Sequence, residues 1–170
     1  MSSGTKNLLV ESIPRYGVAS RDKIDRSEGE VARMFSDAER EILDLPAFAS
    51  LATMLPDGAP QMTVMWYRRV GDDLHMITPA ETRKARNIAR DPRAAIIVTD
   101  PDNGYAFVEM RGRIELSRDP VAIRDALFAI ATRYIGAERA ESYTASRDPN
   151  ERVLIIFYPE HVVGHFAQRP

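Results

Sequence analysis

Cationic residues cluster directly after an apolar strand, in the segment from residue 78 to residue 92. The whole chain of 170 residues carries a net charge of only −2, so this local excess is not bulk composition. A hydroxyl at a strand end and cations in the first turn of a helix are groups that bind phosphate well. The pattern therefore predicts a phosphate site whose candidate ligands are Thr78, Arg83, Lys84, Arg86 and Asn87.

The same charges fit a second interpretation. A solvent-exposed helix face commonly carries lysine and arginine that pair with nearby acids, which here would be Glu81 and Asp91. Charge spacing alone favours this solvated face slightly over a ligand site.

The predicted strand at residues 61–69 is rich in large, flat or polarisable side chains. An aromatic cofactor ring can lie along such a strand while backbone amides contact its polar edge. The alternative is that Met62, Val64 and Trp66 are simply part of the core. The candidate ring-binding residues are Met62, Thr63, Val64, Met65 and Trp66.

Other kinds of active site find little support. The chain has no cysteine, which excludes disulfides, thiolate metal sites and cysteine nucleophiles. His161 and His165 share a strand face, but no third ligand accompanies them, so we predict no metal site. A Gly-Lys-Ser/Thr phosphate loop and a Gly-x-Ser-x-Gly nucleophile elbow are both absent. We therefore assign no catalytic side chain from the sequence.

Composition bounds the partners and the location. The slight negative charge argues against general nucleic-acid binding, which usually needs a basic surplus. We see no signal-peptide pattern at the start and no apolar segment of roughly 20 residues that would span a bilayer. We expect a cytoplasmic protein without a membrane or nucleic-acid partner.

The elements that must position these residues form a single domain at residues 34–170, after a polar N-terminal arm at residues 1–33. A capping box at Ser36 and Glu39 predicts the first helix, ending near residue 45. Asp119-Pro120 predicts the start of another, ended by Gly136. We expect further helices at 81–90 and 138–145. The predicted strands are 47–55, 61–69, 74–78, 93–99, 105–116, 152–158 and 161–166.

Six or seven short strands with few helices predict a mainly β fold with peripheral helices, of the α+β class. The strands do not alternate regularly with helices, so an antiparallel, closed or half-closed barrel is favoured over a doubly wound parallel sheet. The strand at residues 105–116 alternates cleanly. Its second face mixes aromatic and charged side chains, including Tyr105 and Phe107, which suits an interface or a cofactor wall.

The order of four sequence blocks resembles the pyridoxamine 5'-phosphate oxidase-like split β-barrel superfamily. The blocks are Leu51-Ala-Thr-Met-Leu-Pro-Asp-Gly-Ala-Pro-Gln61, Met65-Trp-Tyr67, Arg83-Lys-Ala-Arg-Asn-Ile-Ala-Arg-Asp-Pro-Arg93 and Val108-Glu-Met-Arg-Gly-Arg113. Within the superfamily the chain looks most like the flavin/deazaflavin oxidoreductases of the F420-dependent branch. The tail from Arg152 to Gly164 is also similar to that branch.

This resemblance implies a homodimer with two cofactor sites at the subunit interface. It places the cofactor ring along Met62–Trp66 and the phosphate on Thr78, Lys84, Arg86 and Asn87. Arg83 matches a phosphate-binding arginine of FMN-using members, so FMN stays open as the cofactor. Tyr105 and Phe107 match aromatic residues that approach the cofactor from the other subunit. The substrate segment of the authentic pyridoxamine phosphate oxidases has no match at residues 168–170, which argues against vitamin B6 oxidation.

Three functions follow from the resemblance. The first is an oxidoreductase that uses reduced coenzyme F420 for hydride transfer to a small conjugated or planar acceptor. The second is an FMN-dependent oxidase or reductase of the same fold. The third is a non-catalytic carrier of F420 or FMN.

Overall fold

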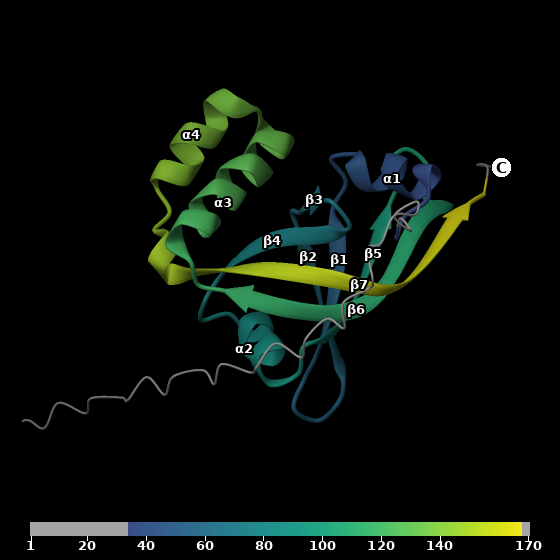
Figure 1. The fold of residues 1–170 in the computed structure, drawn as a ribbon, viewed down its shortest axis with the longest axis horizontal. Coiled ribbons are helices and arrows are strands. Elements are labelled where there is room, and N and C mark those ends of the chain that lie inside the picture. The colour runs from purple at the N-terminus through teal and green to yellow at the C-terminus, as the bar shows by residue number, and fades with distance from the viewer. Residues whose placement is uncertain (1–33, 168–170) are drawn as a thin grey trace, which may run out of the picture. The chain divides into compact units, whose positions relative to one another are not determined.

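The computed structural model describes residues 34–167, and the expected N-terminal arm at residues 1–33 lies outside them. Seven antiparallel strands form one sheet in the order β2-β1-β5-β6-β7-β4-β3, with four α-helices around it (Figure 1). The predicted α+β class and strand number are confirmed. The strands are β1 (Ala49–Met54), β2 (Pro60–Met65), β3 (Arg68–Val70), β4 (Asp73–Pro79), β5 (Arg93–Thr99), β6 (Ala106–Ser117) and β7 (Arg152–Phe166). The helices are α1 (Asp37–Asp44), α2 (Arg83–Arg90), α3 (Pro120–Ile135) and α4 (Ala137–Ala145), and a 3-10 turn spans Pro149–Glu151.

The sheet closes on itself at a two-residue connection. β2 and β3 stand at opposite edges of the strand order, yet only Trp66 and Tyr67 separate them in the chain. The sheet must therefore curve until its two edges adjoin, although these edges do not pair with each other. The result is a split β-barrel. The prediction of one strand over residues 61–69 was wrong, because β2 pairs with β1 and β3 pairs with β4.

Short-range signals set several element boundaries. The Ser36 hydroxyl accepts from the Glu39 amide while the Glu39 carboxylate accepts from the Ser36 amide at 2.7 Å, so the predicted capping box is formed. Asp119 caps α3 and Gly136 ends it, also as predicted. Between β1 and β2 the turn needs Gly58, whose φ of +86° is strained for other residues.

Apolar side chains from nearly every strand fill the barrel interior, and helices close its two ends. α1 contributes Ile42 and Leu43 to this core beside the start of β1, whereas α2 contributes Ile88 beside the end of β1. Figure 1 shows the two helices at opposite ends of the sheet. α2 is therefore held by burial of its apolar side, which leaves its cationic side outside the core.

The longest pairing, between β6 and β7, contains one irregularity. The register shifts between Arg111 and Gly112, which allows Pro159 to sit within β7 opposite Gly112. A Cβ atom at Gly112 would lie 2.0 Å from the Tyr158 carbonyl oxygen, so only glycine fits there. Two separate strands were predicted on either side of Pro159, and the structure shows one continuous strand instead.

A second apolar layer lies on the outside of the barrel, under α3. Ile123, Leu127, Ile130 and Ala131 are buried on α3. They face β4 and β7, and α4 packs beside α3 (Figure 1). No helix within residues 34–167 is long and apolar enough to cross a membrane.

Candidate functional site

The predicted ring-binding strand presents two different faces. On β2, Met62 is 59% exposed and Val64 is 65% exposed, whereas Met65 points into the barrel and is 7% exposed. The core interpretation is therefore wrong for Met62 and Val64. Thr63 is half-buried. Large apolar side chains on an open strand face need another surface to cover them.

Trp66 leaves the end of this strand and packs under α3 and α4. Its ring stacks on Tyr134, with 4.8 Å between ring centroids and 3° between ring planes, and it also contacts Tyr143. Trp66 is thus held rigidly from one side beside the exposed face of β2.

The phosphate candidates Thr78 and Lys84 do come together, and Thr82 joins them. The Lys84 ammonium donates to the Thr78 hydroxyl at 3.3 Å, and the Thr78 and Thr82 hydroxyl oxygens lie 3.2 Å apart. Thr82 is the N-cap of α2 and accepts from the Ala85 amide. Sequence reasoning missed Thr82, although a threonine three residues before Ala85 is a recognisable cap signal.

Burial lowers the pKa of the Lys84 ammonium from its ordinary value, because a half-buried cation loses solvation. Within residues 34–167, Lys84 has no acidic partner. The first amides of α2 also lack acceptors inside the helix, and its first turn carries no acid. An under-solvated ammonium, two hydroxyls and a positive helix end together make a fitting site for an anion.

Arg83 is exposed beside this group and makes no hydrogen bond or ion pair in the described part of the chain. Its side chain is therefore available to a ligand. It lies at the first position of α2, next to Lys84.

The other two phosphate candidates are engaged elsewhere. Asn87 is 2% exposed and donates to Thr53 at 3.2 Å and to Gln61 at 2.8 Å, which ties α2 to β1 and β2. Arg86 donates to the Glu81 carbonyl oxygen at 2.7 Å. Neither side chain contacts the Thr78–Lys84 pair, and phosphate binding by them stays a prediction.

The solvated-face interpretation predicted ion pairs that the structure does not contain. Asp91 pairs with Arg93 at 2.6 Å, outside α2, and hydrogen bonding from Arg93 lowers the pKa of Asp91 to about 2. Within the described residues, the Glu81 side chain takes part in no ion pair. The cations of α2 thus lack the acidic partners that this interpretation predicts, which leaves them available to an anionic ligand.

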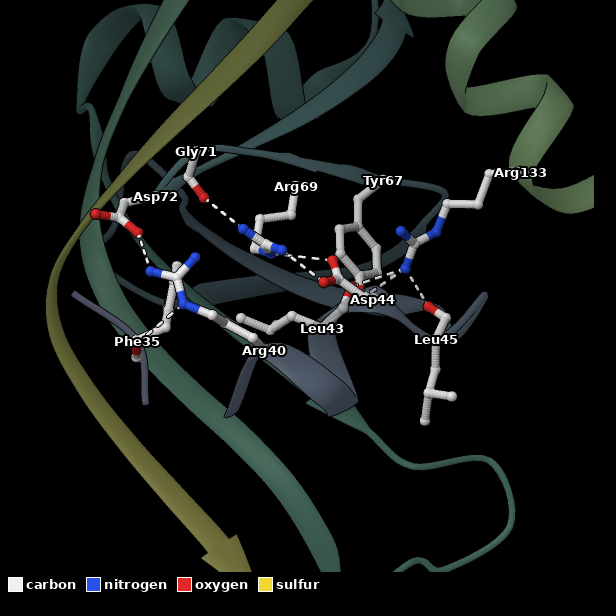
Figure 2. Close-up of polar contacts among 10 residues, drawn as sticks. All are labelled: Phe35, Arg40, Leu43, Asp44, Leu45, Tyr67, Arg69, Gly71, Asp72 and Arg133. Atoms are coloured by element: carbon white, nitrogen blue, oxygen red, sulfur yellow. Dashed lines mark hydrogen bonds and ion pairs between the residues drawn. The ribbon is translucent and has the colours of Figure 1, made fainter. Parts of the chain in front are cut away.

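A second polar cluster, which the sequence did not reveal, stabilises the seam of the barrel, that is, the connection of Trp66 and Tyr67 between β2 and β3. The Tyr67 hydroxyl donates to the Leu43 carbonyl oxygen at 2.7 Å, and Arg133 of α3 donates to the carbonyl oxygens of Leu43 and Leu45 (Figure 2). Tyr134 accepts from the Tyr67 amide at 3.2 Å. Burial raises the pKa of the Tyr67 and Tyr134 phenols, so both stay neutral donors.

Further ion pairs fasten α1 to the turn after β3. Figure 2 shows Arg69 reaching both Asp44 and the Gly71 carbonyl oxygen, and Arg40 reaching Asp72 at 2.9 Å. These contacts hold α1 against β3 and the turn that follows it.

A cavity of about 280 Å³ opens between β2, β4, β7 and the α3–α4 pair. Val64, Trp66, Ile77, Leu127 and Tyr143 form apolar walls, and Arg152 adds one guanidinium. The cavity is therefore continuous with the exposed face of the predicted ring-binding strand.

The aromatic residues predicted to reach a second subunit lie on the outer side of β6. Tyr105, just before this strand, is 55% exposed, and the Phe107 ring stacks on His165 with centroids 4.3 Å apart. Residues 34–167 contain no group of three or more acidic or histidine side chains that could hold a metal ion.

Comparison with known proteins agrees with this architecture. Residues 35–165 match the family model described as pyridoxamine 5'-phosphate oxidase. A solved structure named F420 reductase is 30% identical, with a TM-score of 0.64, and the match covers 76% of this chain and 98% of that one. A conserved hypothetical protein from Mycobacterium tuberculosis is 25% identical with a TM-score of 0.68, covering 82% and 89% of the two chains. General Stress Protein 26 from Bacillus anthracis shares the fold at 15% identity and a TM-score of 0.59, covering 75% and 91%.

Proposed function

The chain belongs to the pyridoxamine 5'-phosphate oxidase family, and on that premise we propose that it is an oxidoreductase that uses coenzyme F420. Flavin-binding oxidoreductases occur in this family. The observation that carries the proposal is the Thr78–Thr82–Lys84 cluster, which offers two hydroxyls and an ammonium without an acidic partner within residues 34–167. Such a donor set fits a phosphate group.

The residues divide into a phosphate clamp and a ring wall. Lys84 and Arg83 would bind the phosphate, with Thr78 and Thr82 orienting it. Met62 and Val64 would lie along the ring, and Trp66 would exclude water at its end. When bound, a deazaflavin supplies hydride transfer, so the protein needs no side-chain nucleophile.

F420 is favoured by the 30% identity to the structure named F420 reductase. FMN is the second candidate, supported by Arg83, which is exposed and unpaired beside Lys84 within the described residues. Because Arg83 resembles the phosphate-binding arginine of FMN-using proteins, substitution of this residue should distinguish FMN from F420 as the cofactor.

A homodimer is part of the same proposal. Phe48, Met62 and Val64 are all more than half exposed, which leaves an apolar surface that a second copy would cover. Tyr105 and Phe107 would then approach the cofactor from the partner. Sedimentation of Val64→Glu should show a monomer, whereas a dimer unchanged by this substitution would place the interface elsewhere.

Parallel titrations with F420 and FMN test the cofactor assignment directly. We expect F420 to bind more tightly and its reduced form to be oxidised by planar acceptors. A protein that purifies yellow with bound FMN and ignores F420 would overturn the F420 assignment. Binding of F420 without turnover across a broad acceptor panel would instead indicate a carrier.

Arg83→Gln sharpens the comparison, with Arg90→Gln as its matched control at the other end of the same helix. If Arg83 serves FMN, its loss should weaken FMN binding about tenfold, since a charge-assisted bond is removed. The control should leave FMN affinity unchanged, because Arg90 already donates to the Met54 carbonyl oxygen.

A further inference from the structure

The cavity beside Trp66 has the composition of a binding site for an amphipathic small molecule. Its volume of about 280 Å³ lies near the lower limit of typical ligand pockets, roughly 300 Å³. Its walls are apolar and partly aromatic, and they come from β2, β4 and α3–α4. A flat ring matches such walls better than a long flexible chain does.

Arg152 is the polar feature of this cavity that lacks an explanation inside the protein. Its Nε is buried and has no hydrogen-bond partner, and its guanidinium forms no ion pair within residues 34–167. Buried polar atoms are normally satisfied, because an unpaired donor costs free energy. The residue begins β7 opposite Pro79, so its backbone is fixed by the sheet.

A carboxylate is the group that would satisfy Arg152. A guanidinium presents paired donors that match the two oxygens of a carboxylate, and the pairing strengthens where water is excluded. We propose that this cavity binds a planar aromatic or conjugated carboxylic acid, with its ring against Trp66 and Leu127 and its carboxylate on Arg152.

The position of the cavity indicates what this ligand does. Val64 and Trp66 both line the cavity; Val64 lies on β2, the strand along which the cofactor ring would lie, and Trp66 directly follows that strand. The bound acid would therefore stand beside the ring, as the acceptor or an analogue of it. This assignment as acceptor rests on the proposed function, whereas binding of the acid does not.

The chain offers a built-in probe, because Trp66 is its single tryptophan. Cofactor-free protein is titrated with cinnamate and with neutral cinnamamide, following Trp66 fluorescence excited at its red edge and heat by calorimetry. We expect saturable binding of cinnamate, at least tenfold tighter than that of the amide.

Arg152→Gln should abolish this preference for the acid and leave amide binding unchanged. Arg152→Lys, which keeps the charge but loses the planar fork, should retain part of it. Arg124→Gln is the matched control, since Arg124 is exposed on α3 and should change neither affinity. Leu127→Phe should fill the cavity and weaken both ligands. Thermal unfolding confirms that each variant is folded.

Repeating the titration with saturating cofactor separates the two proposals. Cinnamate that still binds alongside F420 or FMN supports an acceptor site next to the ring. Competition between cinnamate and cofactor would overturn the proposal, because the cavity would then belong to the cofactor. Equal affinity for acid and amide, or no binding of either, would also overturn it, and would leave cofactor binding by Lys84 untouched.

Discussion

Replacing Lys84 by methionine should separate cofactor affinity from fold stability. Methionine keeps the unbranched stem and its packing but removes the ammonium. In the free protein that ammonium is half-buried, and its one hydrogen-bond acceptor is Thr78 at 3.3 Å, so its charge is poorly compensated. Thr78 keeps its contact with Thr82 after the change.

The two expected effects differ in size and sign. A hydrogen bond to a charged group contributes about 1.5–3 kcal/mol, so the variant should bind the phosphorylated cofactor about 10- to 150-fold more weakly. The free energy of unfolding should stay within about 0.5 kcal/mol or rise, because the half-exposed lysine loses a desolvated charge and only a long hydrogen bond.

The pH dependence of binding provides a second readout. Burial lowers the pKa of Lys84, and only the protonated form attracts phosphate. As the pH rises, affinity of the unmodified protein should therefore fall before an ordinary lysine would titrate, near pH 10.4. In Lys84→Met this part of the pH dependence should disappear.

The assay is a cofactor titration by calorimetry, paired with urea unfolding of the same samples. Arg90→Met controls for loss of one positive charge on α2. A folded Lys84→Met protein that binds cofactor as tightly as the parent would refute the phosphate clamp.

Three further outcomes follow from the fold. Asn87→Ala should lower the free energy of unfolding by about 1–3 kcal/mol, measured in urea, because the buried Thr53 hydroxyl and the part-buried Gln61 carbonyl oxygen lose their donor. Gly112→Ala should destabilise by about 3 kcal/mol through the clash with β7, whereas Gly104→Ala, in open space, should be near neutral; equal urea midpoints would contradict the close approach. Burial, and then Arg68, lowers the pKa of His75, so folding should lose stability as the pH falls below about 6.5; His75→Gln should flatten this slope between pH 5 and 7.5.

Elements defined by short-range chemistry could be predicted from the sequence. The capping box at Ser36 and the Asp119 cap each involve neighbours within a few residues, and each is present. The break at Trp66 could not be predicted, because alternation continues through it and no residue type marks the change of partner strand from β1 to β4. β7 continues through Pro159 since a register shift opposite accommodates the ring.

The candidate site was predictable in charge but not in contacts. The cationic run located Lys84 and Arg83, whereas the buried role of Asn87 depends on Thr53 and Gln61, which lie 34 and 26 residues earlier. Arg133 gave no signal in the sequence, because its acceptors, the carbonyl oxygens of Leu43 and Leu45, are 90 and 88 residues distant. Arg152 belongs to no recognisable motif, and its proposed role in ligand binding follows only from its position in the cavity wall.

The seam at Trp66 and Tyr67 also bears on how the molecule reaches its folded state. Leu43 and Arg133 lie 90 residues apart, so their contact requires closure of a long loop late in synthesis. Strands β1 to β6 leave the ribosome before α3 exists to cover the connection. Folding should therefore be slow and dominated by non-local contacts, because β7, which joins β6 to β4 in the sheet, follows α3 in the chain.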